Sequence, residues 1–241
     1  MKIFVAVVAI IFMSLFVGGC SKNENELVLV TEAGFAPYEY YEDGEIVGVD
    51  IDIAKEIAKE LGKELVIKDV SFDFVINEVK SGKADFAAAG ISITPERAKE
   101  VDFTIEYTTS NQVVVVKKGS NIKSFDDIKN KKIAVQLGTV ADLYVEKNYK
   151  NAEVVAHKKY LSAVEDVKTG KADCIIMDEL PAKAIVSEND NLVILDGILF
   201  QDKYGMIVKK GNDELKEKIN TVLERMSNDG TIEKLVLKHS K

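Results

Sequence analysis

The residues most suited to binding a ligand follow an apolar segment that ends in small side chains. They read Ala89-Gly90-Ile91-Ser92-Ile93-Thr94-Pro95-Glu96-Arg97. Thr94 is typical of a helix N-cap and Pro95 of the first helical position. Free N–H groups at such a helix end, two hydroxyls and a guanidinium would bind a carboxylate or a phosphate. The same residues also fit a capped surface helix with a solvated arginine.

Two further apolar segments end in polar groups, one at Asp178 and one at Gln136-Leu137-Gly138-Thr139. Asp178 also fits an ordinary N-cap, because Pro181 follows early in the next segment. Gly138 and Thr139 open a predicted helix and would offer backbone N–H groups to an anion. Ligands of open α/β sheets bind at the carboxyl ends of strands. A guanidinium and a carboxylate on opposite sides of one cleft would complement the two ends of an α-amino acid.

Two stretches of the chain nearly repeat each other, VKSGKADFAAAG (79–90) and VKTGKADCIIMD (167–178), at an offset of 88 residues. Each copy reads as the end of a helix, a glycine C-cap, a Lys-Ala-Asp turn and a buried strand. The repeat therefore predicts two lobes of similar architecture. The alternative is that a favourable helix-to-strand turn arose twice.

Short apolar runs alternate with amphipathic stretches, which predicts parallel sheets in an α/β fold. The strands expected from these runs are at 27–30, 64–70, 131–137, 153–157 and 172–178. A hairpin is expected at 38–49, with its turn at Asp43-Gly44. The expected helices are one from Asp50 as N-cap to Gly62, and others at 72–82, 140–148, 161–170, 213–228 and after Gly230.

The composition fits a folded protein and argues against a nucleic-acid partner. The chain has 241 residues, of which 46% are hydrophobic and 30% charged, with a net charge of −8. Its Lys and Arg residues are scattered, so no basic stripe is available for a phosphate backbone. We expect no metal or other cofactor, because the sequence has no cluster with metal-ligand spacing.

The N-terminus reads as a targeting segment. Lys2 precedes an apolar run at 3–17, which is shorter than the ~20 residues that a membrane-spanning helix needs. The alternative is a weak transmembrane anchor. Val17-Gly18-Gly19-Cys20 resembles the lipobox of bacterial lipoproteins, which implies cleavage before Cys20 and acylation of its thiol. The other cysteine, Cys174, lies in an apolar run and is expected to be a buried, inert thiol.

Five stretches together resemble the solute-binding proteins of amino-acid ABC transporters, family 3. They are GVDIDIAKEIAKELG, SGKADFAAAGISITPER, VDFT, AVQLGT and KADCIIMDELPA. The resemblance runs from Leu27 to the end of the chain. It implies the two-lobed, type II periplasmic-binding-protein fold, with each lobe a mostly parallel sheet flanked by helices.

The resemblance also implies a division of the chain. A signal peptide at 1–19 and a lipidated tether at 20–26 precede the folded part. Lobe 1 is discontinuous, at 27–106 and 205–241, and lobe 2 is inserted at 112–199. Two crossing strands at 107–111 and 200–204 form the hinge.

Carried over residue by residue, the resemblance assigns roles to eight residues. Arg97 would bind the ligand α-carboxylate bidentately. Ser92 and the Thr139 amide would bind the same carboxylate. The Gly90 carbonyl, the Ser92 hydroxyl and Asp178 would take the α-ammonium. Phe35 and Phe72 would sandwich the ligand side chain, and Glu32 would meet its tip. Core packing is the alternative for the phenylalanines, and a solvated loop position the alternative for Glu32.

Glu32 is an acceptor and favours a ligand side chain with N–H donors. We therefore expect a basic amino acid (arginine or lysine), with glutamine second. Gln136 stands where some glutamine binders carry a lysine, and Met177 would add an apolar wall.

The implied function is binding by hinge closure, followed by delivery to an ABC permease and its ATPase. The protein would be a monomer held by its lipid anchor on the outer face of a membrane. One alternative is an enzyme like the periplasmic dehydratase that acts on aromatic amino-acid precursors. Another is a sensor module that reports a bound amino acid to a partner receptor.

Overall fold

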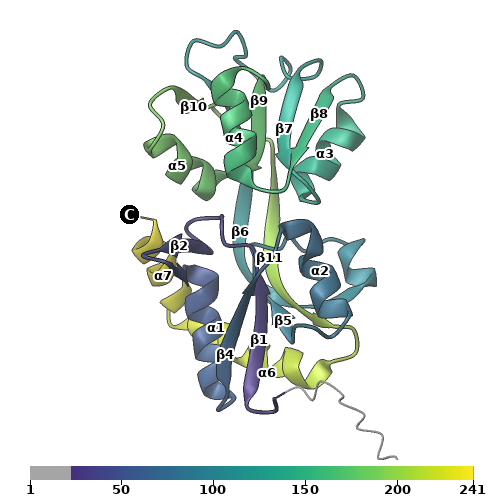
Figure 1. The fold of residues 1–241 in the computed structure, drawn as a ribbon, viewed down its shortest axis with the longest axis vertical. Helices are drawn as coiled ribbons and strands as arrows, with labels where there is room; N and C mark the ends of the chain where they lie inside the picture. Colours follow the sequence, from purple (N-terminus) through teal and green to yellow (C-terminus); the bar gives the residue numbers. More distant parts are fainter. Residues whose placement is uncertain (1–22, 241) are drawn as a thin grey trace, which may run out of the picture.

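The fold is a two-lobed α/β arrangement, as the alternating pattern predicts (Figure 1). The computed structural model describes residues 23–240. The predicted signal peptide at 1–19 and the predicted lipidation site Cys20 lie outside the described residues. Among the residues that are described, no helix is both long enough and apolar enough to cross a membrane.

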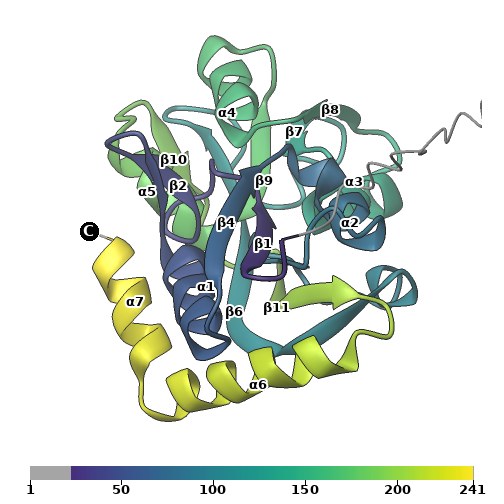
Figure 2. The same cartoon turned by 60° about the horizontal axis from the view of Figure 1, so that its bottom comes forward.

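Lobe 1, the lower part of Figure 1, combines the two ends of the chain. Its strands are β1 (Glu26–Thr31), β4 (Glu64–Asp69) and β5 (Phe86–Ala87), with a separate hairpin of β2 (Tyr40–Glu42) and β3 (Glu45–Val47). Its helices are α1 (Val49–Glu60), α2 (Phe72–Lys80), the 3₁₀ turn η1 (Arg97–Lys99), α6 (Asp213–Asn228) and α7 (Thr231–His239). Figure 2 shows α6 along the lower edge of this lobe and α7 along its side, and both helices pack against α1.

Lobe 2, the upper part of Figure 1, is built from the middle of the chain. Its strands are β7 (Lys132–Gln136), β8 (Glu153–His157), β9 (Cys174–Asp178) and β10 (Leu192–Ile194). Its helices are α3 (Val140–Asn148), α4 (Tyr160–Thr169) and α5 (Glu179–Ser187). For the strands and helices predicted within this lobe at 131–178, the observed bounds agree with the predicted ones to within one or two residues.

Two long antiparallel strands run through both lobes, β6 (Val101–Lys117) and β11 (Phe200–Lys209). They join the parallel strands of each lobe into one nine-stranded sheet, in the order β4-β1-β5-β11-β6-β9-β7-β8 with β10 beside β6. β6 has 17 residues and so extends over about 55 Å. The register of the pair shifts between Tyr204 and Ile207, where the strands pass from one lobe to the other.

The two copies of the sequence repeat make the same contacts in the two lobes. Asp85 pairs with Val28 of β1 through both its backbone N–H and its side chain, each at 2.8 Å. Asp173 pairs with Lys132 of β7 in the same way and at the same distances. Gly82 and Gly170 both adopt positive φ, at 75° and 81°. The prediction of two lobes of similar architecture is confirmed, and each repeat fixes a strand beside its neighbour.

Two local predictions are wrong. Asp50 was expected to cap its helix, but Gly48 occupies the N-cap and Asp50 is fully buried in the first turn of α1. The helix expected after Thr94 and Pro95 is only the short 3₁₀ turn η1. Glu96 is the N-cap of η1, while the Thr94 hydroxyl accepts the Arg97 N–H at 3.2 Å.

Cys174 is buried in the core, and burial raises the pKa of its thiol to about 12. The expectation of an inert thiol agrees with this placement.

Candidate ligand-binding site

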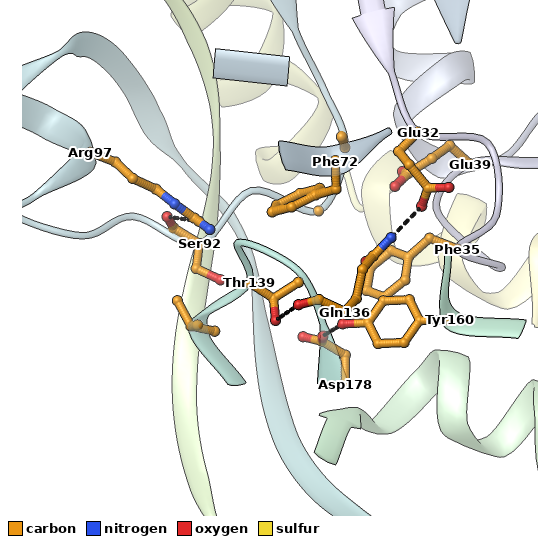
Figure 3. Close-up of a pocket in the computed structure, with 13 residues that line it drawn as sticks. Glu32, Phe35, Glu39, Phe72, Ser92, Arg97, Gln136, Thr139, Tyr160 and Asp178 are labelled. Carbon is orange, nitrogen blue, oxygen red and sulfur yellow. Dashed lines mark hydrogen bonds between the residues drawn. The ribbon is translucent and has the colours of Figure 1, made fainter. Parts of the chain in front are cut away.

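A pocket lies between the lobes, where strands of both lobes end. Figure 3 shows its side chains converging from loops at the ends of β1, β5, β7 and β9. All eight ligand residues expected from the sequence line it. The full lining is Glu32, Phe35, Glu39, Phe72, Ala89, Gly90, Ser92, Arg97, Gln136, Thr139, Val140, Tyr160 and Asp178.

Arg97 is the buried cation of the pocket, only 7% exposed. Its Nη1 donates to the Ser92 carbonyl at 2.8 Å and its Nη2 to the Gly138 carbonyl of the other lobe at 3.0 Å. The guanidinium also lies over the Phe72 ring, 5.4 Å from its centroid. Burial lowers the pKa of Arg97, and Asp202 and Asp178 oppose that effect. A guanidinium has five donors, so Arg97 retains donors for an anion.

Asp178 is the buried carboxylate that ends β9, and it belongs to a network on the crossing strands. Its Oδ1 accepts hydrogen bonds from Ser110 and Gln112, both at 2.6 Å, and from the Tyr204 hydroxyl. Tyr160 donates to Oδ2 at 3.5 Å. Burial raises the pKa of Asp178, while the Ser110, Tyr204 and Gln112 hydrogen bonds oppose the rise.

Ser92 and Gly90 lie on the lobe 1 side of the pocket. The Ser92 hydroxyl donates to Asp202 of β11. Burial and then the charge of Asp178 raise the pKa of Asp202 to about 6. Gly90 adopts a φ of +53°, and a Cβ there would lie 2.6 Å from the Phe35 ring. The backbone approaches the aromatic wall so closely that only glycine fits.

The start of α3 supplies part of the lobe 2 wall. Thr139 is the N-cap, and its Oγ1 accepts the Asp142 N–H at 3.3 Å. The expectation that Gly138 offers its N–H to an anion is wrong, because the Asp142 carboxylate accepts it at 2.9 Å. The Thr139 N–H donates to the Gln136 carbonyl at 3.3 Å. The N–H groups of Val140 and Ala141, in the first turn of α3, have no acceptor within the helix.

Aromatic rings line the pocket from both lobes. Phe35 stacks on Tyr160 of α4, with centroids 5.4 Å apart and planes at 20°. Phe72 lies on α2, on the other side of the pocket beside Arg97 (Figure 3). Tyr160 was missed from the sequence, because nothing in HKKYLSA distinguishes a pocket tyrosine from a core one. Met177 is buried in the core and is absent from the pocket lining.

Glu32 is 1% exposed, and both its oxygens already have partners from lobe 2. Oε1 forms an ion pair with Lys159, and Oε2 accepts from the Gln136 amide at 3.1 Å. Lys159 also lies 3.7 Å from Asp69 of lobe 1. This ion-pair group therefore bridges the two lobes beside the pocket.

Glu39 is a third carboxyl in the pocket wall, beside Glu32 and Asp178, and it was not predicted from the sequence. It is 1% exposed, and neither side-chain oxygen has a hydrogen-bond donor in the part of the chain that the structure describes. Burial, and then the charge of Asp50, hold the pKa of Glu39 well above its usual range. A carboxyl between two aromatic residues, as in Tyr38-Glu39-Tyr40, is the only local signal for it.

Residues 23–240 contain no group of His, Cys, Asp and Glu side chains arranged to hold a metal ion. The chemistry of the pocket is that of one guanidinium, several carboxyls and aromatic rings. Such a set binds a small zwitterion.

Comparisons with known proteins point to one family. Residues 27–241 match the family model described as bacterial extracellular solute-binding proteins, family 3. The chain is 32% identical over 224 residues to the arginine-binding extracellular protein ArtP of Bacillus subtilis strain 168, covering 90% of this chain and 87% of that one. It is 34% identical over 199 residues to the glutamine-binding protein GlnH of the same organism, covering 81% and 73%.

Solved structures agree with these relatives. The substrate-binding protein AbpA of Streptococcus pneumoniae, bound to L-arginine, matches with a TM-score of 0.85 at 36% identity, covering 89% of this chain and 94% of that one. An ancestral arginine-binding protein bound to glutamine matches with a TM-score of 0.85 at 40% identity, covering 90% and 99%. The two-lobed fold is therefore that of type II periplasmic binding proteins.

Proposed function

Since the chain belongs to the bacterial extracellular solute-binding proteins of family 3, we propose that it captures a polar L-amino acid and delivers it to an ABC permease. The ligand side chain is basic, as in arginine or lysine, or an amide, as in glutamine. Relatives that bind arginine and glutamine support this choice.

One observation carries the proposal: a buried guanidinium and a buried carboxylate line one pocket from opposite lobes. Arg97 takes the ligand α-carboxylate together with Ser92 and the Thr139 amide. Asp178, the Gly90 carbonyl and the Ser92 hydroxyl take the α-ammonium. Phe35 and Phe72 enclose the side chain. Glu32 lies where the tip of the side chain would reach.

Binding works by closure of the lobes about residues 107–111 and 200–204. A ligand that touches both lobes stabilises the closed form by its differential affinity for it. Lobe 1 comprises 27–106 and 205–241, and lobe 2 comprises 112–199. The loaded, closed protein then docks on the permease and its ATPase.

The protein acts outside the cytoplasm as a monomer. Acylation at Cys20 anchors it to the outer face of a membrane after removal of residues 1–19. It is a binding protein without catalytic activity, and incubation with arogenate or prephenate is expected to give no product.

Thermal melts of the purified protein against the twenty L-amino acids test this function. The protein is first unfolded and refolded to remove any carried-over ligand. A ligand at 100 times its Kd stabilises the folded state by about 2.7 kcal/mol, which raises the melting temperature measurably. One or two hits among arginine, lysine and glutamine are expected. No shift with any amino acid would contradict the proposal.

A further inference from the structure

Glu39 is the pocket carboxyl that the proposed binding mode leaves without a role. It lines the pocket next to Glu32, as Figure 3 shows. Both its oxygens are buried and lack a donor among the described residues. Glu32, in contrast, is neutralised by Lys159 and bonded to Gln136. A buried carboxyl without a donor is unfavourable as a charged group, so Glu39 must hold a proton when the pocket is empty.

The neighbouring carboxyl of Asp50 shows that the proton is held by Glu39. After burial, the charge of Asp50 is the largest cause of the raised pKa of Glu39, so these two buried carboxyls hold one proton between them. Asp50 accepts the Gly90 N–H at 3.0 Å and the Tyr107 hydroxyl at 2.8 and 2.9 Å. Because Asp50 is already the acceptor of these donors, the shared proton belongs to Glu39.

The charged groups around Glu39 decide what can remove the proton. Those that face it are mostly acidic or hydroxylic: Asp50 on α1, Glu32 after β1, Asp178 at the end of β9, and the Tyr38 and Tyr107 hydroxyls. The two nearby cations are occupied, Arg97 by backbone carbonyls and Lys159 by Glu32 and Asp69. Neither of these two cations is therefore available to an ionised Glu39, because Lys159 is paired and the remaining donors of Arg97 are those proposed to bind the ligand α-carboxylate.

The charges of the pocket are balanced for a ligand whose side chain is neutral. Lys159 cancels Glu32, while Arg97 and Asp178 match the two ends of a zwitterion. A cationic side chain would meet no unpaired carboxylate in the pocket lining as long as Glu39 stayed protonated, since Asp50 and Asp202 are not part of that lining. Burial of an unpaired cation is strongly unfavourable, and release of the Glu39 proton would remove that cost by supplying a carboxylate.

We propose that Glu39 adjusts the charge of the pocket to the ligand, keeping its proton for a neutral amide side chain and releasing it to solvent for a guanidinium or ammonium. The ionised carboxylate then accepts N–H bonds from the ligand cation. This inference rests on the proposed function and specifies how one site accepts both classes of side chain.

Calorimetric titration in buffers of different ionisation enthalpy counts the protons released on binding. At pH 7 the refolded protein is titrated with L-arginine and with L-glutamine. The two ligands share their α-groups, so any proton released near Asp178 and Asp202 is common to both. Arginine is expected to release about one proton more than glutamine.

Two variants locate the source of the proton. Glu39→Gln keeps the shape and a donor toward Asp50 but holds no titrating proton. It is expected to remove the difference in proton release and to weaken arginine binding at least tenfold relative to glutamine binding. Glu42→Gln, the same change at an exposed position of the same segment, is expected to alter neither quantity.

Equal proton release for the two ligands, or an arginine-specific proton that survives in Glu39→Gln, would overturn the inference. Binding of glutamine without any binding of arginine would overturn it as well. Failure of all twenty L-amino acids to bind would instead refute the proposed function, and the thermal melts detect that result without any proton count.

Discussion

At the scale of single residues, Arg97 is the group on which recognition of the ligand α-carboxylate depends. Its planar fork is fixed by two backbone carbonyls and lies over the Phe72 ring. An ammonium cannot reproduce that fork geometry. Arg97→Lys is therefore expected to lower amino-acid affinity at least tenfold, or about 1.4 kcal/mol. Arg225→Lys, at a half-exposed position on α6, is the control and is expected to leave affinity within twofold. Equal affinities for both variants in a calorimetric titration would remove Arg97 from the site.

The close approach of the Gly90 backbone to the Phe35 ring can be tested by adding a methyl group at position 90. Alanine there would combine the strain of positive φ with a contact 2.6 Å from the Phe35 ring. Gly90→Ala is expected to cost about 1–3 kcal/mol of folding stability and to weaken ligand binding at least tenfold. Gly119 also has positive φ, at +78°, but has no atom within 4 Å of an added Cβ. Gly119→Ala should show the loss of stability in urea unfolding without the loss of affinity. If both variants bind equally well, Phe35 is not part of the ligand wall.

At the scale of elements, the end of β1 and the start of α4 hold the lobes together through the ion pair of Glu32 with Lys159. The Lys159 side chain is 42% exposed, so solvent screens the pair. Lys159→Gln is expected to favour the open form and to lower ligand affinity about fivefold, or about 1 kcal/mol. Small-angle scattering of the ligand-free protein should show a larger radius of gyration.

The control for that change lies on the same helix. Lys168→Gln removes an ion pair with Glu165, which is three residues away on α4 and outside the cleft. It is expected to change neither the radius of gyration nor the affinity. A Lys159 variant that scatters like wild type would show that this ion pair does not hold the lobes closed.

The elements are also where sequence-based prediction succeeds best. Helices such as α3 and α6 have the predicted bounds, because apolar spacing and end residues such as Thr139 act locally. Asp50 was misassigned since its sequence position suits a cap, whereas its partners Gly90 and Tyr107 are distant in sequence. The helix after Pro95 was overextended for the same reason: local signals open a helix, but the chain turns immediately into β6.

The pocket was predictable in part. The eight expected residues came from motifs that resemble a known family, and all of them line one pocket. Glu39, Tyr160 and Lys159 were missed because their proximity arises only when the lobes face each other. Their individual sequence contexts are ordinary. The partners of Glu32 could not be predicted either, since Lys159 is 127 residues away in the chain.

At the scale of the whole molecule, the protonated Glu39 couples folding stability to pH. The unfolded chain releases this proton above a pKa of about 4.3, whereas the native state, in which the pKa is raised, retains it. The stabilisation by this group is therefore complete below that pH and is lost as pH rises toward the native pKa. Glutamine at position 39 does not ionise, so it makes no pH-dependent contribution to folding stability.

Urea unfolding of wild type and Glu39→Gln at pH 5 and pH 7 measures the effect. As pH rises, the free energy of unfolding of wild type is expected to fall relative to that of Glu39→Gln, by up to about 1.4 kcal/mol per pH unit. Glu42 is exposed on β2, so Glu42→Gln is expected to show the same change of unfolding free energy with pH as wild type. A constant difference between Glu39→Gln and wild type would mean that Glu39 is ionised in the native protein.

The central claim is that an amino acid bridges the two lobes by its two charged ends. Calorimetric titration with the best-binding amino acid, its α-amide and its N-acetyl form tests this directly. The amide removes the charge that Arg97 binds, and acetylation removes the charge that Asp178 binds. Both analogues are expected to bind at least 100-fold more weakly than the free amino acid, or about 2.7 kcal/mol. Binding of either analogue within threefold of the free amino acid would contradict the bridging role of that end.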